Sequence, residues 1–134
     1  MVRPSDFQSD NRGFKSPQDH QKGETVIIIL VKIVREISHD ENNIEIGRFY
    51  KSINLSPEGE IPQLNTYLKL DGEESFFVEQ KIQYASKRGD SDYYETSSYE
   101  LTTSDTLFYY ENWDNKGFKL KEKGLLALGW KKTF

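Results

Sequence analysis

The stretch Thr25–Ile37, T-V-I-I-I-L-V-K-I-V-R-E-I, decides the fold of this chain. Seven of the nine residues from Val26 to Val34 are Ile or Val. Branching at Cβ restricts rotamers on a helix but packs well on a pleated strand. The run is apolar on both faces at its start, and Lys32, Arg35 and Glu36 interrupt it later. This pattern predicts a long strand that enters the core and leaves at a rim.

Shorter strands separated by turn signals are expected after this long strand. Asp71-Gly72 is the strongest hairpin signal in the chain, and Gly47, where the apolar phase changes, is expected to mark a β-bulge. Leu125, Leu126 and Leu128 favour a last strand, because Gly124 and Gly129 weaken the alternative of a short helix. The expected turns are Ser38–Asn43, Ser56–Pro62, Ser86–Asp92 and Thr102–Asp105, and the later strands are Leu64–Leu70, Ser75–Tyr84, Tyr93–Leu101, Leu107–Trp113 and Phe118–Lys121.

Strand and turn signals at short spacing, without one convincing long helix, predict an all-β domain. The expected architecture is an antiparallel meander of about seven strands that closes into a barrel-like sheet, with a two-sheet sandwich as the alternative. Residues 1–23 contain two prolines, two glycines and no periodic apolar pattern. We therefore expect a flexible arm over residues 1–23 and a single β domain over residues 24–134.

The composition limits where the protein can be expected in the cell and which kinds of site it can contain. The 134 residues include no cysteine, which excludes disulfides and thiolate metal sites. Residues 1–22 lack the apolar segment of a secretory signal, and the apolar run from Val26 to Val34 is far shorter than the roughly 20 residues that span a bilayer. The sequence therefore predicts a soluble, cytoplasmic protein without membrane contact.

Charge is distributed unevenly along the chain. Residues 1–115 hold 12 basic and 21 acidic groups, a balance of −9, whereas residues 116–134 hold six lysines and one glutamate, a balance of +5. A basic end on an acidic body can meet an acidic partner, a phosphate backbone or the protein's own acidic face. Lysines that protect an exposed edge strand are the simpler structural interpretation.

Residues typical of enzymes are scarce. The two histidines, His20 and His39, fall in the expected arm and in a turn, and no glycine-rich phosphate loop occurs. Asp90, Asp92 and Glu95 could offer oxygen ligands, but their spacing does not fit a calcium loop and is typical of a polar hairpin turn. We expect no enzyme activity, no catalytic residue, no cofactor and no metal site.

Aromatic residues make up 13% of the chain and cluster between Tyr93 and Trp113. Cross-strand aromatic pairing would explain them structurally. Beside lysines they also favour a binding surface, and we expect a non-enzymatic binding or adaptor domain that recognises another, acidic protein. The candidate partner-binding residues are Tyr109, Trp113, Lys119, Lys121 and Trp130. The alternatives are a single-stranded nucleic-acid-binding protein, which the net charge of −4 disfavours, and a carrier of a small apolar ligand.

Overall fold

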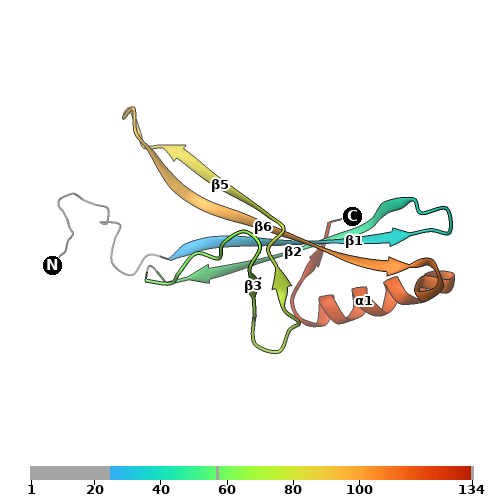
Figure 1. Cartoon of the computed structure of the whole chain (residues 1–134). Helices are drawn as coiled ribbons and strands as arrows, with labels where there is room; N and C mark the ends of the chain where they lie inside the picture. The colour runs from blue at the N-terminus through green and yellow to red at the C-terminus, as the bar shows by residue number, and fades with distance from the viewer. Residues whose placement is uncertain (1–24, 57, 134) are drawn as a thin grey trace. The chain divides into compact units, whose positions relative to one another are not determined.

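The computed structural model describes residues 25–56 and 58–133 (Figure 1). The arm expected over residues 1–23 lies outside these residues. Strands dominate the described chain, so the predicted all-β class is confirmed. The elements are β1 (Val26–Ile37), β2 (Asn43–Leu55), β3 (Tyr67–Leu68), β4 (Phe76–Phe77), β5 (Gln80–Lys87), β6 (Tyr94–Phe108), the 3-10 segment η3 (Tyr109–Asn115), α1 (Lys116–Ala127) and β7 (Lys131–Lys132).

Strand β1 is the centre of a five-stranded sheet with the order β5-β6-β1-β2-β7 (Figure 1). The predicted long strand is therefore confirmed, and Ile28, Leu30 and Val34 are fully buried on it. β6 pairs with β1 in parallel, from Ile27 opposite Ser98 to Ile37 opposite Phe108. This pairing corrects the purely antiparallel meander. A parallel neighbour suits β1, because parallel strands are normally covered on both faces.

Strand β6 runs without interruption through Thr102–Asp105, where the sequence predicted a turn. Thr102 and Thr103 are buried, and their partners on β1 are Val31 and Lys32. Threonine is β-branched and fits a strand as readily as a turn. Pairing with β1 therefore outweighs the local turn composition.

The hairpin predicted at Asp71-Gly72 is confirmed, although its strands are short. β3 and β4 pair antiparallel as a separate two-stranded sheet, with Tyr67 opposite Phe77. Gly72 has a φ of 77°, which favours glycine, and the N–H of Glu73 donates to the carbonyl of Leu70 at 3.1 Å. This turn places the carboxylate of Glu73 where it accepts hydrogen bonds from Lys51 and Trp130.

The end of the chain is helical where strands were expected. Leu107–Trp113 divides between the end of β6 and η3, while Phe118–Lys121 and the leucine cluster at residues 125–126 belong to α1. The strand predictions for these segments are wrong. Alternation over the four residues 118–121 also matches a helix whose inner face continues to Leu125, and Leu125 is buried.

Gly47 explains part of this outcome. A Cβ added at Gly47 would lie 2.4 Å from Cε1 of Phe118, so the missing side chain leaves room for that ring against β2. Gly47 and Phe49 are both buried on the same side of the strand. Gly47 therefore marks the close approach of α1 to β2, and its predicted role in a bulge finds no support in the burial pattern.

The large sheet is open, with β5 and β7 at its edges, and no closed barrel is found among the described strands. The chain separates into two compact units. The first takes in, among the described residues, Thr25, Val26 and residues 54–61 apart from 57, where the N–H of Gly59 donates to the carbonyl of Ser56 at 2.8 Å. The second comprises Ile27–Ile53 and residues 62–133, and it holds all the candidate residues.

Candidate protein-binding surface

The segment after β6 makes a sharp, unusual turn that carries Trp113. Trp113 itself is extended, with a ψ of 125°, and the next two residues, Asp114 and Asn115, have φ values of 55° and 62°. Two consecutive left-handed residues other than glycine are rare, and Asp and Asn tolerate this conformation best. Outliers of this kind persist only where the surrounding structure holds them.

Asn112 holds this turn in place. Its side chain is buried, with 5% of the residue exposed. Nδ2 donates to Oε2 of Glu36 on β1 at 2.7 Å, and Oδ1 accepts the N–H of Phe118 at 2.8 Å. The second bond satisfies one of the N–H groups that the first turn of α1 leaves without a helical acceptor. Asn112 thereby caps α1 and ties it to the central strand.

Gly117 allows the same turn to close tightly. A Cβ at this position would lie 2.4 Å from the carbonyl oxygen of Glu111 and 3.3 Å from Cα of Asn112. The side chain of Glu111 accepts the N–H of Phe108 at 3.1 Å, which fixes the start of η3. The turn that carries Trp113 is therefore fastened at both of its ends.

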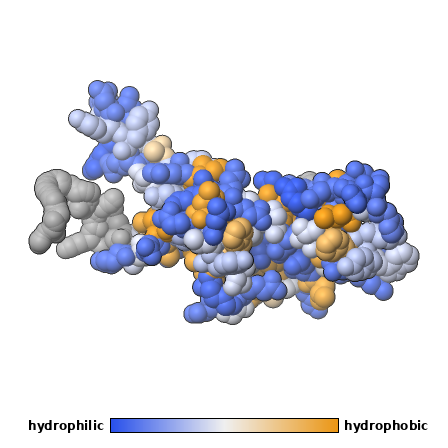
Figure 2. Space-filling view, in the orientation of Figure 1, coloured by the Kyte–Doolittle hydropathy of each residue, from blue (hydrophilic) through white to orange (hydrophobic). Residues whose placement is uncertain are grey.

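The aromatic side chains of η3 are largely exposed. Trp113 is 65% exposed, Tyr110 stacks on Phe108 with 5.8 Å between ring centroids, and Tyr109 lies 4.0 Å from the ring of His39. Figure 2 shows apolar residues (orange) as small patches on a mostly hydrophilic face. Single exposed apolar residues are ordinary, but tryptophan is a recurrent anchor of protein interfaces, and here the backbone that carries it is fixed.

The outer face of α1 is basic and carries an exposed leucine. Lys116, Lys119 and Lys123 have helical spacing on one face, and Leu120 between them is 74% exposed. Among the described residues none of these three lysines has an ion-pair partner. The inner face carries Phe118, Lys121 and Leu125. The basic groups on the outer face are therefore available for an anionic partner.

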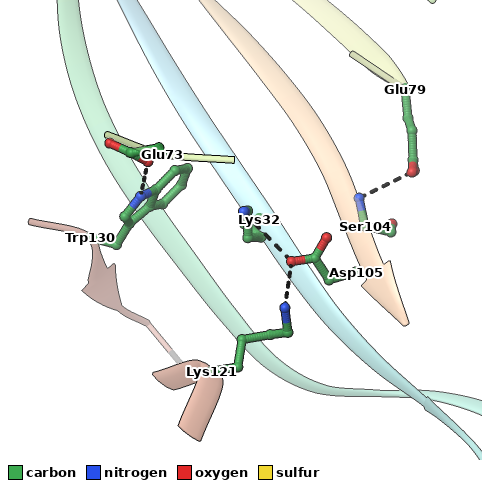
Figure 3. A network of polar contacts seen from close by, with 7 residues as sticks. All are labelled: Lys32, Glu73, Glu79, Ser104, Asp105, Lys121 and Trp130. Carbon is green, nitrogen blue, oxygen red and sulfur yellow. Dashed lines mark hydrogen bonds and ion pairs between the residues drawn. The ribbon is translucent and has the colours of Figure 1, made fainter. Parts of the chain in front are cut away.

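Lys121 and Asp105 belong to a network beneath this helix (Figure 3). Oδ2 of Asp105, on β6, accepts from Nζ of Lys121 at 3.1 Å and lies 3.6 Å from Nζ of Lys32 on β1. Lys32 is buried, and its ammonium is also 5.4 Å from the ring centroid of Trp130. One carboxylate thus joins α1 to the two central strands of the sheet.

Trp130 belongs to a second buried network, around Glu73 (Figure 3). Its Nε1 donates to Oε1 of Glu73 at 2.9 Å, and its ring stacks on Phe76 at 6.4 Å. Lys51 donates to Glu73 as well and to the carbonyl of Leu128 at 2.7 Å, beside the end of α1. Burial acts to raise the pKa of Glu73, but the bonds from Lys51 and Trp130 and the charges of Lys51 and Lys32 together hold it below 4.5. Glu73 is therefore a partly buried carboxylate that is charged at neutral pH.

The five candidate residues predicted from the sequence divide between the protein surface and the two polar networks. Trp113, Lys119 and part of Tyr109 lie at the surface, whereas Lys121 is engaged with Asp105 and Trp130 is buried at 3% exposure. Trp130 therefore presents no ring to a partner. Sequence reasoning missed Tyr110, Lys116, Leu120 and Lys123, although the lysine spacing 116, 119, 123 is a helical signal. We call the set Tyr109, Tyr110, Trp113, Lys116, Lys119, Leu120 and Lys123 the exposed C-terminal face.

The described residues give little support to a metal site or a membrane-spanning helix. Within residues 25–56 and 58–133 no three His, Asp or Glu side chains gather in a way that could hold a metal ion. The helices of the same part of the chain are too short and too polar to cross a membrane. No family model, curated protein or solved structure matches this chain.

Proposed function

We propose that this protein is a non-enzymatic binding protein that recognises an acidic protein partner through the exposed C-terminal face. The observation that carries the proposal is Trp113, an indole 65% exposed on a turn with two consecutive left-handed residues. A conformation of this kind is common at binding sites, where the surrounding structure offsets its cost.

Rigidity strengthens the case for Trp113 as an anchor. Asn112 and Gly117 fix the backbone on either side of it before any partner arrives. Binding costs less when the contact groups are already ordered, and tryptophan is enriched among residues that contribute most to interfaces. We therefore expect a central contact from the indole, with Tyr110 and Leu120 adding apolar area around it.

Charge selects the partner. Lys116, Lys119 and Lys123 repeat along the outer face of α1, and none of them forms an ion pair with another residue that the structure describes. Complementary charge raises association rates and excludes partners of like charge. A carboxylate-rich protein surface fits this arrangement. The proposal includes the cytoplasmic location expected from the cysteine-free sequence, which cell fractionation tests.

The experiment compares proteins retained from native lysate by the wild-type chain and by Trp113→Ala. Loss of an interfacial tryptophan typically costs about 2 kcal/mol or more, so the variant should bind the retained partner roughly 30-fold more weakly. Lys119→Glu should also weaken binding and lower its dependence on salt. Tyr67→Ala is the matched control, because Tyr67 is an exposed aromatic residue on β3.

The same eluates also test the nucleic-acid alternative, which uses the same aromatic and basic groups. If the retained partners disappear after nuclease treatment, the surface would be assigned to binding single-stranded nucleic acid. Partners retained equally by wild type, Trp113→Ala and Lys119→Glu would refute the exposed C-terminal face as a binding surface.

A further inference from the structure

The outer end of β5 and β6 is a two-stranded ribbon, with no third strand beside it in the part of the chain that the structure describes. β5 pairs with β6 as far as Lys87 opposite Tyr94, whereas β1 joins β6 only from Ser98 onward. Residues 83–97 are exposed on both faces except at Ser91. Ribbons of two strands are marginal in water unless something packs against them. We call residues 84–97 the ribbon tip.

The ribbon tip has the side chains of a recognition loop. Tyr93 is 79% exposed, Tyr94 and Tyr84 are also exposed, and serine and glycine fill the turn. Tyrosine with small polar residues is the composition of loops that recognise proteins. Arg88 is paired with Glu95 at 2.7 Å, whereas Lys87, Asp90 and Asp92 are exposed and have no ion-pair partner among the described residues, so two carboxylates and one ammonium leave the ribbon tip with a balance of −1.

The ribbon tip cannot reach the exposed C-terminal face of its own molecule. Lys121 lies against Asp105, eleven residues along β6 from Tyr94, and a strand of that length spans roughly 36 Å. Figure 1 shows the tip and α1 at opposite ends of β6. A contact between the two surfaces must therefore join two molecules.

We propose that the acidic partner of the exposed C-terminal face is the ribbon tip of a second copy of this chain. Asp90 and Asp92 supply carboxylates for the lysines of α1, and Tyr93 and Tyr94 supply aromatic area for Trp113 and Leu120. Each copy carries one tip and one face, so the contact is heterologous and produces a head-to-tail chain or a closed ring. This inference rests on the proposed function, because it names that partner.

Sedimentation velocity of the purified full-length chain tests this inference. Wild type should show species larger than a dimer as its concentration rises toward about 1 mM at low salt, and these should dissociate at about 500 mM salt. The face variant, Lys119→Glu with Lys123→Glu, and the tip variant, Asp90→Lys with Asp92→Lys, should each weaken association by about tenfold or more. Within each variant the two surfaces then carry like charges.

An equimolar mixture of the two variants is the decisive sample. The acidic tip of the face variant fits the basic helix of the tip variant, and the basic tip of the tip variant fits the reversed helix, so association should return. The matched control is Asp71→Lys with Glu74→Lys, which reverses two exposed acids in the β3–β4 turn and should leave association unchanged.

Three results would overturn the inference: wild type that is monomeric at every concentration, association that survives either variant, or a mixture that stays monomeric. The proposed function has a separate readout. If the wild-type chain is monomeric but still retains an acidic protein in a Trp113-dependent manner, only the second-copy inference fails. If that retention is absent as well, the proposed function fails with it.

Discussion

Replacing Asn112 with alanine should destabilise the protein substantially, although Asn112 lies in a turn. The substitution removes the acceptor for the N–H of Phe118, which is worth about 1 kcal/mol for a helix cap. It also removes the donor to Glu36, and hydrogen bonds to charged groups contribute about 1.5–3 kcal/mol. Glu36 is half-buried, so water replaces part of that second bond. We expect a loss of about 2–3 kcal/mol.

Urea denaturation measures this loss. With a slope of about 2.5 kcal/mol per M for a chain of this size, the midpoint should fall by about 1 M while the slope stays constant. Asn42→Ala is the matched control, because Nδ2 of Asn42 also donates to a carboxylate, that of Asp40 at 3.1 Å, in an exposed turn. Its effect should be within about 0.5 kcal/mol. A midpoint for Asn112→Ala equal to that of Asn42→Ala would refute the role of Asn112 as the fastening of the turn.

Further predictions concern the packing beneath α1. Gly47→Ala should cost about 1–3 kcal/mol, because its Cβ would meet Phe118 at 2.4 Å, and Phe118→Leu in the same chain should recover part of the loss in urea titrations. The pKa of Glu73 is held low in the folded protein, so its contribution to stability is present above pH 4.5 and is lost as the pH falls through the folded pKa. Glu73→Gln should therefore flatten the acid side of a plot of unfolding free energy against pH, and an unchanged slope would contradict this account. Asp105→Asn should leave Lys32 buried without a carboxylate and cost more than Lys121→Met, whose ammonium lies at the edge of the network; thermal unfolding of both variants gives the order.

Local sequence was sufficient to predict β1 and the turns at Asp71-Gly72 and Ser86–Asp92. In each case the signal is contained within a few residues: β-branched side chains in β1, and glycine with a positive φ in both turns. The all-β class follows from these signals, because they recur along most of the chain.

The parallel pairing of β1 with β6 could not be read in the same way. Ile27 and Ser98 are partners although 71 residues separate them, and nothing near either residue specifies the other. The mistaken turn at Thr102–Asp105 has the same origin. The polar residues of this segment fit a strand because β1 pairs with one edge of β6 and because Asp105 forms ion pairs with Lys32 and Lys121.

The candidate surface was half predictable for a related reason. Exposure of Trp113 and Lys119 agrees with the composition of the segment, but the burial of Trp130 depends on Glu73, Phe76 and Lys51, which lie between 54 and 79 residues earlier in the chain. Composition alone cannot separate an indole that anchors a partner from one that fills a core. The expectation of a strand also obscured the grouping of Lys116, Lys119 and Lys123, because a strand would have placed Lys116 on the face opposite to Lys119 and Lys123.

The ion pairs of the fold decide how the basic end of the chain is to be interpreted. Of the six lysines after residue 115, Lys121 forms an ion pair with Asp105 and Lys132 forms one with Glu122. Four remain without an acidic partner among the described residues, and three of these lie on α1 and only Lys131 on a strand. Protection of a sheet edge therefore explains one of the four. The other three surround Leu120, which is 74% exposed, and solvation alone would not require an apolar side chain among them. An acidic surface with an apolar centre accounts for both features, so Leu120→Ser should weaken partner binding while Lys131→Glu should not.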